Sequence, residues 1–235
     1  MLFRQLFDAA SSTYTYLLAD QKTSDAVLID PVREHMDSYL RLLDELELKL
    51  VMAVDTHVHA DHITALGLLR ETTGCVTYMG QQAQADCVSA RFSDGEKLRF
   101  GSHELVAIYT PGHTDDSYSF YLDDNGQRYV FTGDTLLIRG TGRTDFQNGD
   151  AHQQYHSLFE RLLSLPGDTA VFPAHDYKGW TTSSIAEERL HNPRLQVASE
   201  AEYVQLMHAL KLPNPRLMDV AVPANRACGM PAASL

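Results

Sequence analysis

The chain has 235 residues, of which 44% are hydrophobic, enough for one large core. Its formal net charge of −12 argues against nucleic acid as a partner, because phosphate binding requires clustered Lys and Arg. No apolar stretch approaches the roughly eighteen residues that span a bilayer, and the first residues look like a strand rather than a signal peptide, so we expect a cytoplasmic protein that binds no membrane.

The first third of the chain is expected to alternate strands with helices. The expected strands cover residues 2–7, 13–18, 26–29 and 48–54. Apolar residues at helical spacing predict an amphipathic helix over 34–47. A second, short helix over 63–71 is expected to end at Gly74.

The rest of the chain continues the alternation without an internal repeat. Further strands are expected over residues 75–79, 97–100, 104–109, 117–122 and 128–131, and helices over 152–164, 182–190 and 199–210. The turn at residues 123–126 contains Asn125-Gly126 and makes a hairpin of the last two strands. The Pro-rich end from Pro213 is too short and too poor in periodicity for a second domain.

The three cysteines are Cys75, Cys87 and Cys228, widely spaced and without a C-x-x-C pair. This usage fits a reducing compartment, so we expect no disulfide framework. We expect Cys228 to be buried or inert, because no loop typical of sulfurtransferases surrounds it.

A cluster of histidines follows the buried strand over 48–54. His57, His59, Asp61 and His62 fall within the seven residues 56–62. Loops at the carboxyl ends of buried strands carry the chemistry of α/β folds, and imidazole and carboxylate are metal ligands. The cluster therefore predicts a metal site.

Further candidate ligands each follow a strand-like run. His113 comes after residues 105–109, Asp134 after 129–133 and His175 after 169–174. Strands that end at one edge of a sheet bring such side chains together. Spacing alone leaves open whether one metal or two are bound, because imidazole suits zinc and iron alike.

The pattern H-x-H-x-D-H, followed by His113, Asp134 and His175, resembles the metallo-β-lactamase superfamily over nearly the whole chain. The segments THVHADHIT (56–64), GTGRTDFQ (140–147) and HDYKG (175–179) are more narrowly similar to the persulfide dioxygenases, relatives of glyoxalase II. The resemblance implies an α/β fold, the metallo-β-lactamase αββα sandwich. It also implies that residues 1–235 form a single domain of this fold with a short C-terminal tail.

The resemblance to the persulfide dioxygenases also assigns the metal. It implies one Fe(II) per chain, held by His57, His113 and Asp134 with further positions open for substrate and dioxygen. The remaining candidates are then groups that orient these ligands, or the ligands of a vacant second metal site; they are His59, Asp61, His62 and His175. No catalytic side chain is assigned beyond the metal ligands.

The implied reaction is the oxidation of glutathione persulfide by O2 and water to glutathione and sulfite, in sulfur metabolism and hydrogen sulfide detoxification. The alternative is a glyoxalase II-like thioester hydrolase with a dinuclear metal site. Against it, Ile63-Thr64-Ala65 replaces the Gly-Gly pair common after that motif, and no long basic C-terminal helical domain follows. A metal-binding scaffold without turnover is the third reading. The expected partners are glutathione persulfide and O2, and we expect a homodimer.

Glutathione carries two carboxylates and requires donors. Tyr177 matches a glutathione-contacting tyrosine of the related glyoxalase II motif, and Lys178 follows it. Arg143 is expected either to bind the substrate or to brace its loop by pairing with Asp145 or another carboxylate, since planar Arg donors serve both uses. Arg226 is a weaker candidate for a substrate carboxylate.

Overall fold

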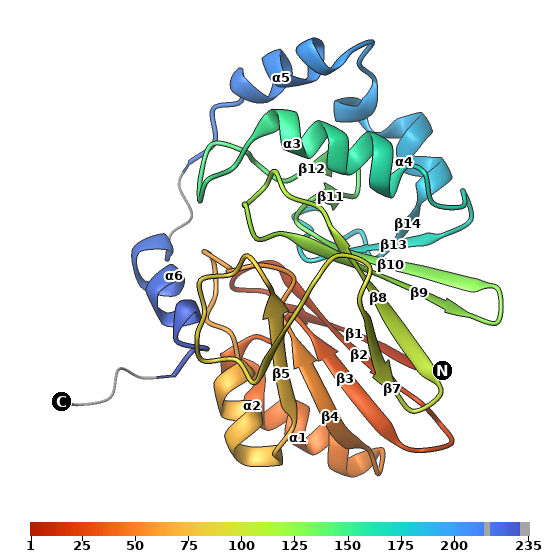
Figure 1. Ribbon diagram of the computed structural model, residues 1–235, viewed down its shortest axis with the longest axis vertical. Helices are drawn as coiled ribbons and strands as arrows, with labels where there is room; N and C mark the ends of the chain where they lie inside the picture. The colour runs from red at the N-terminus through yellow and green to blue at the C-terminus, as the bar shows by residue number, and fades with distance from the viewer. Residues whose placement is uncertain (214–216, 231–235) are drawn as a thin grey trace. The chain divides into compact units, whose positions relative to one another are not determined.

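The structure is a computed structural model that describes residues 1–213 and 217–230 (Figure 1). The chain divides into two compact units. Unit 1 takes residues 1–92 and 98–104 and the C-terminal part of the chain, and unit 2 takes residues 93–97 and 105–213. Each unit combines a sheet with helices, as the predicted α/β class requires.

The sheet of unit 1 has six strands in the order β1-β2-β3-β4-β5-β6. The strands are β1 (Leu2–Asp8), β2 (Thr13–Ala19), β3 (Asp25–Ile29), β4 (Lys49–Val54), β5 (Val76–Gly80) and β6 (Ala90–Phe92). The first three are antiparallel, and β3 to β6 are parallel. Parallel neighbours require crossover connections. Helix α1 (Met36–Glu45) connects β3 to β4, and helix α2 (Leu66–Thr73) connects β4 to β5. The loops that follow β3 and β4 therefore begin at the same edge of the sheet.

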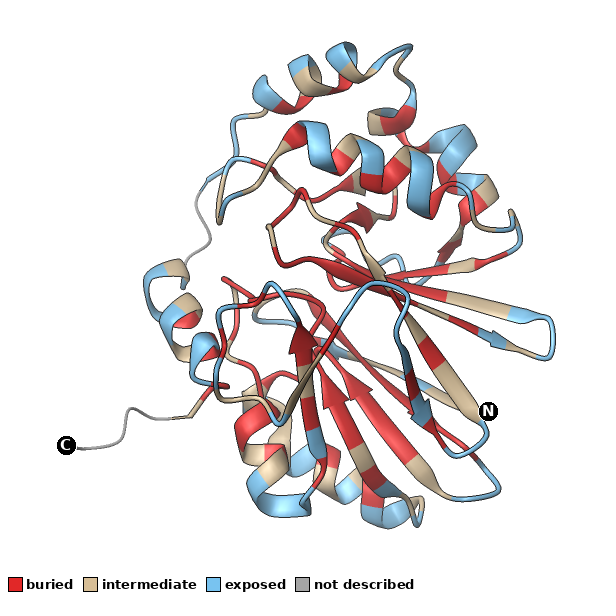
Figure 2. Cartoon of the chain, in the orientation of Figure 1, coloured by how far each residue is buried: buried red, intermediate tan, exposed pale blue. Residues whose placement is uncertain are grey.

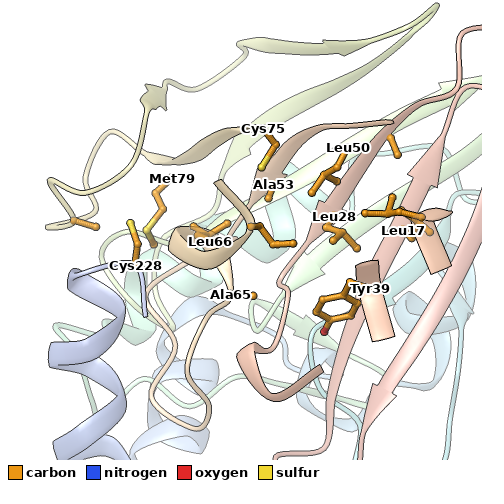
Figure 3. Close-up of a cluster of buried hydrophobic side chains, with 14 of the residues drawn as sticks. Leu17, Leu28, Tyr39, Leu50, Ala53, Ala65, Leu66, Cys75, Met79 and Cys228 are labelled. Atoms are coloured by element: carbon orange, nitrogen blue, oxygen red, sulfur yellow. The ribbon is translucent and has the colours of Figure 1, made fainter. Parts of the chain in front are cut away.

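The core of unit 1 lies between this sheet and its two crossover helices. Figure 3 shows Leu28 and Leu50 from the strands together with Tyr39 and Leu66 from the helices. All four side chains are buried. In Figure 2, buried and exposed residues alternate along the helices, so one side of a helix is buried and the other is exposed. The apolar stripe of each helix thus faces the sheet, as the helical spacing of α1 predicted.

The second sheet has the order β14-β13-β10-β9-β8-β7. Its strands are β7 (Lys97–Phe100), β8 (His103–Tyr109), β9 (Tyr118–Asp124), β10 (Gln127–Gly133), β13 (Ala170–Pro173) and β14 (Ser183–Ser184), with a separate short ribbon of β11 (Leu136–Leu137) and β12 (Gly140–Thr141). The strands β8, β9 and β10 form an antiparallel meander, and β13 adds in parallel to β10. The loops after β10 and β13 consequently begin at one edge.

The helices of unit 2 are α3 (Ala151–His156), the π-helical turn η2 (Ser157–Leu162), α4 (Ile185–His191) and α5 (Glu200–His208). Their buried side chains form one cluster with the sheet. Leu158 and Leu162 of η2 and Ile185 of α4 pack with Val130 and Val171 of the strands. The core of unit 2 is therefore built as in unit 1, from a sheet and the helices packed against it.

Most of the expected elements are present, with shifted ends. Asn125 and Gly126 both have positive φ in the turn between β9 and β10, which confirms the predicted hairpin. Gly74 ends α2 in the left-handed conformation, as expected. The helix predicted over 152–164 begins at Ala151 and changes to a π-helical turn at Ser157. No helix in the described part of the chain combines the length and hydropathy that crossing a membrane requires.

The C-terminal end contains a helix that the sequence did not predict. Residues Met218–Arg226 form α6, although Pro223 lies inside it. Proline removes a helical N–H, which is why the Pro-rich end was read as irregular. The predicted short C-terminal tail thus includes an ordered helix, while residues 214–216 and 231–235 lie outside the described residues. The organisation of residues 1–235 as one domain stays a prediction.

The expectation of no disulfide was wrong. Cys87 and Cys228 are bonded to each other across 141 positions of sequence, whereas Cys75 is free and buried. The spacing of cysteines in sequence cannot reveal such a pair. It forms because the end of α6 returns to the segment between β5 and β6.

A buried carboxylate ties two turns of unit 1 together. Asp20 follows β2, and Oδ2 accepts hydrogen bonds from the amide and the hydroxyl of Ser102, both at 2.6 Å. Oδ1 accepts from the Lys22 amide at 2.7 Å. Gly101 lies against this carboxylate, because a Cβ there would lie 2.4 Å from Asp20 Oδ2. The hydrogen bonds from Ser102 and Lys22 hold the pKa of Asp20 well below its ordinary value.

We expect Asp20→Asn to reduce the unfolding free energy of the protein in a pH-dependent way. A carboxyl with a lowered pKa contributes stability above its ordinary pKa of about 4, and this contribution is lost as the pH falls towards the folded value. The difference between parent and variant should therefore be largest near pH 7 and shrink below about pH 4. Urea denaturation of the metal-free proteins across this range measures it. A difference that stays constant down to pH 2 would contradict the assignment.

Candidate metal centre

His57 lies in the loop after β4, and a relay of hydrogen bonds fixes its tautomer. The Thr56 hydroxyl donates to Asp30 Oδ2 at 3.0 Å and lies 3.0 Å from His57 Nδ1. Because that hydroxyl has a single hydrogen, it must accept from the His57 Nδ1–H. The lone pair of the His57 ring is therefore on Nε2, which is the atom that a metal would bind.

The same carboxylate orients His59, which is fully buried. His59 Nε2 lies 3.1 Å from Asp30 Oδ1, while Nδ1 is buried without a hydrogen-bond partner among the described residues. Burial disfavours a charge on His59, but the adjacent Asp30, with Asp55 and Asp61, raises its pKa to about 9. The surroundings thus favour a cation at this ring, either a proton or a metal ion that replaces it.

Asp61 and His62 complete the cluster within unit 1. Asp61 Oδ2 accepts from the Thr13 hydroxyl at 3.0 Å and lies 2.9 Å from His62 Nδ1. The ring centroids of His57 and His59 are 4.2 Å apart, and those of His59 and His62 are 4.3 Å apart. Candidate ligand atoms of His59, Asp61 and His62 all lie within 4.8 Å of one another. Unit 1 therefore gathers the whole predicted cluster on one loop.

Unit 2 brings its three predicted residues together in the same manner. His113 follows β8, and its Nδ1 donates to the Arg143 carbonyl at 2.8 Å, which leaves the ring lone pair on Nε2. That atom lies 3.5 Å from Asp134 Oδ2. The other oxygen of Asp134, Oδ1, lies 2.6 Å from Nδ1 of His175. Asp134 thus presents Oδ2 beside His113 while His175 holds Oδ1.

The donor set fits a metal ion. Metal-binding histidines usually donate their second ring N–H to a carboxylate, a carbonyl or another oxygen, which fixes the tautomer. All five candidate histidines have one ring nitrogen within hydrogen-bond distance of such an oxygen. Imidazole and carboxylate together suit iron or zinc. His57 belongs to unit 1 and the His113–Asp134 pair to unit 2, and each unit presents its ligands with the tautomers that coordination requires.

Of the predicted substrate-binding residues, three are exposed and Arg143 is held in an ion pair. Tyr177 is 71% exposed, and its ring stacks on His175 with centroids 5.9 Å apart and planes 4° apart. Lys178 is exposed beside it. Arg143 makes a two-pronged ion pair with Asp145 through Nε at 2.6 Å and Nη2 at 2.8 Å. Its Nη1 donates to the Pro213 carbonyl at 2.7 Å. Arg226 is exposed at the end of α6 in unit 1.

Sequence reasoning missed three polar residues that orient the cluster. Asp30 was given no role, although a carboxylate after β3 belongs at the same edge of the sheet as the histidines after β4. Thr56 lay inside the motif but was given no role. Asn225 contacts the backbone of the histidine loop from α6, and its sequence context offered no signal.

Comparison with known proteins finds one matching family model and three similar proteins. Residues 9–86 and 88–175 match the family model of the metallo-β-lactamase superfamily. Human mitochondrial persulfide dioxygenase ETHE1 is 48% identical over 98% of this chain and 89% of its own length. ETHE1 from Myxococcus xanthus is 53% identical in sequence to this chain. Its crystal structure matches with a TM-score of 0.94 over 98% of this chain and all of that chain. TTHA1623, solved in a di-iron-bound form, is 25% identical with a TM-score of 0.69 over 81% of this chain and 98% of its own.

The chain belongs to the metallo-β-lactamase superfamily and, within it, to the family of the ETHE1 persulfide dioxygenases. Both the predicted fold class and the resemblance inferred from the three motifs are thereby confirmed. The family also accounts for the cluster of histidine and aspartate ligands, which supports a metal cofactor.

We expect Arg143 to brace its loop. Arg143→Ala should lower the unfolding free energy by roughly 1–2 kcal/mol, because a bidentate pair and a carbonyl contact are lost together. Asp145→Asn is the matched control, since it weakens the same pair and leaves the guanidinium in place. Urea denaturation and steady-state kinetics on both variants decide. If Arg143→Ala raised KM without loss of stability, the guanidinium would be a substrate ligand instead.

Proposed function

We propose that this chain is a persulfide dioxygenase that oxidises glutathione persulfide with O2 and water to glutathione and sulfite at one iron. The observation that carries the proposal is the 48% and 53% identity, over nearly the full length, to two ETHE1 proteins, one of them named as a persulfide dioxygenase. The orientation of the candidate ligands supports it from the chain itself.

The proposed iron ligands are His57 Nε2, His113 Nε2 and Asp134 Oδ2. These two imidazoles and one carboxylate would hold iron(II) with coordination positions left open, and the iron would supply the redox chemistry with dioxygen. The relay from Asp30 through Thr56 keeps the lone pair of His57 on the coordinating atom. The contact of His175 with Oδ1 supports a role for Asp134 as a ligand through Oδ2.

The remaining members of the cluster then act on the ligands rather than on the iron. The hydrogen bonds of His59 with Asp30 and of His62 with Asp61 hold the loop around His57 in place. Orientation of this kind lowers the cost of assembling the site, because the ligands need not reorganise when substrate binds. The chain needs no nucleophilic side chain for this chemistry.

For substrate binding we propose Tyr177 and Lys178 as contacts for the glutathione moiety. Both side chains are exposed next to the buried His175, which supports a position at the edge of the metal site. There the Lys178 ammonium and the Tyr177 hydroxyl would bind a substrate carboxylate. Arg143 and Arg226 remain weaker candidates.

A second function is favoured by a specific observation. His59 Nδ1 is buried without a partner among the described residues, and TTHA1623 was solved with two irons. A dinuclear thioester hydrolase of the glyoxalase II kind would use His57, His59, His113 and Asp134 for one metal, and the other metal would bind Asp61, His62, Asp134 and His175.

We further propose that the enzyme works in the cytoplasm, binds no nucleic acid and no membrane, and forms a homodimer. The charge of −12 supports the absence of nucleic acid as a partner. Size-exclusion chromatography with light scattering measures the oligomeric state.

Protein produced in iron-rich medium should contain about one iron per chain and consume O2 with glutathione persulfide, because the ligand set leaves coordination positions open. Elemental analysis and an oxygen electrode measure both quantities, and S-lactoylglutathione is the control substrate. Two zinc ions per chain, with thioester hydrolysis and no oxygen uptake, would support the hydrolase instead.

Ligands and orienting residues should differ in iron content. His57→Ala, His113→Ala and Asp134→Ala should abolish iron retention, whereas His62→Ala should keep most iron and lower turnover by about ten- to a hundredfold. Iron analysis of the purified variants is the measurement. An empty site in His62→Ala with a full site in His57→Ala would reverse the assignment.

Removal of the Tyr177 hydroxyl tests the substrate contact. Tyr177→Phe should mainly raise KM for glutathione persulfide, because a contact remote from the reacting sulfur acts on ground state and transition state alike. Oxygen-electrode kinetics give both constants. A change confined to kcat would place Tyr177 near the chemistry rather than at the glutathione moiety.

A further inference from the structure

The C-terminal helix α6 holds the backbone of the histidine loop through one buried side chain. Asn225 Nδ2 donates to the carbonyls of His59 at 2.9 Å and His62 at 2.8 Å. Asn225 Oδ1 accepts from the Thr64 amide at 2.9 Å. Asn225 is fully buried, so these three backbone groups depend on it.

The residues after Asn225 pack against the same loop without space for side chains. The Gly67 amide donates to the Cys228 carbonyl at 2.9 Å. A Cβ on Gly229 would lie 2.0 Å from the Thr64 carbonyl oxygen, and one on Gly67 would lie 2.8 Å from the Cys228 carbonyl oxygen. The end of α6 and the start of α2 are therefore in direct backbone contact.

The rest of α6 is weakly anchored. Its buried residues are Ala221 and Asn225, while Val220 is 58% exposed. A segment with so few buried apolar side chains opens at low free energy unless another bond retains it. The disulfide between Cys87 and Cys228 is such a bond. It joins the residue three positions after Asn225 to the segment between β5 and β6.

The two sulfurs differ in access. Cys228 is fully buried in the core cluster of unit 1, close to Met79 and Leu66 in Figure 3. Cys87 is only partly buried, and Arg70 of α2 donates to its carbonyl. A small thiol would therefore attack the Cys87 sulfur.

We propose that Asn225 is a positioning residue for the metal-binding loop and that the Cys87–Cys228 disulfide locks it there, so that reduction by a low-molecular-weight thiol loosens the loop. Disulfides in cytoplasmic proteins are usually exchangeable and redox-sensing, which fits this position beside an active site. The inference rests on the proposed metal site only for its effect on iron, because the loosening itself is a property of unit 1.

The exchange proceeds in two steps. A thiolate attacks the Cys87 sulfur, the bond to Cys228 breaks, and the released Cys228 thiolate takes a proton. A second thiolate attacks the sulfur of the small molecule in the mixed disulfide and releases Cys87, which is protonated in turn. Two small thiols are oxidised to one disulfide, and one protein disulfide becomes two thiols.

The first experiment tests the effect of reducing the disulfide. It uses the metal-free parent protein, which is treated with dithiothreitol and then separated from it under argon. Hydrogen exchange measured by mass spectrometry should show faster exchange in the peptide that covers residues 59–64, by at least about tenfold at the Thr64 amide, because Asn225 Oδ1, the acceptor of that amide, is released. Cys87→Ser should show the fast rate with and without dithiothreitol. Cys75→Ser, which changes the free thiol, should respond as the parent does. Equal rates in the oxidised and reduced parent would overturn the lock.

The positioning arm compares Asn225→Leu and Asn225→Asp with Asn192→Leu. Asn192 is a matched control in unit 2, fully buried and donating to the carbonyls of Gly140 and Leu137. In the iron-loaded proteins, release of iron to a chelator should be about 10- to 100-fold faster in Asn225→Leu, with an intermediate rate in Asn225→Asp, which keeps the acceptor for Thr64.

The control separates positioning from general destabilisation. Asn192→Leu should lower the melting temperature but leave the exchange of residues 59–64 unchanged. If Asn192→Leu accelerated this exchange as much as Asn225→Leu does, Asn225 would be an ordinary stabilising residue and the proposal would fail. If only the iron result failed while residues 59–64 responded, the proposed iron site would be wrong and the lock would stand.

Discussion

The metal centre depends on the hydrogen bonds that assign a proton to one nitrogen of each histidine. A metal binds the nitrogen without the proton, so a ring with the wrong tautomer presents an N–H to the ion. Asp30 fixes two of these rings, His59 directly and His57 through a threonine hydroxyl. The Asp30 carboxylate thus determines which ring nitrogens of His57 and His59 are free to bind a metal.

In each sheet, a pair of parallel strands places a candidate ligand and the group that orients it at the same edge. Asp30 follows β3 and the histidines follow β4, and the two strands are parallel neighbours, so the orienting carboxylate and the ligands leave the same edge. In unit 2 the parallel pair of β10 and β13 places Asp134 and His175 in the same relation. Parallel pairing therefore brings His57 and His59 next to Asp30, and Asp134 next to His175, whereas His113 is oriented by the Arg143 carbonyl.

The sequence predicted the strands and helices that have a clear apolar period. It also singled out the candidate ligands His57, His59, Asp61, His62, His113, Asp134 and His175, but it gave no role to Asp30. It missed α6 because Pro223 masks the helical pattern, and it missed the bond between Cys87 and Cys228 because the pair depends on where α6 returns. The role of Asp30 was not predicted because local patterns identify ligands by residue type. An orienting residue is defined only by its partner in space.

The central proposal is that one iron binds Asp134 Oδ2 together with His57 Nε2 and His113 Nε2, the two nitrogens that the hydrogen bonds leave without a proton. Anomalous diffraction at the iron edge from crystals of the iron-loaded protein tests this most directly. The account predicts a single iron peak bonded to these three atoms at about 2.0–2.2 Å, the usual range for such donors. A second peak about 3.5–4 Å away and bonded to His59 Nδ1, as in two-metal sites, would contradict it.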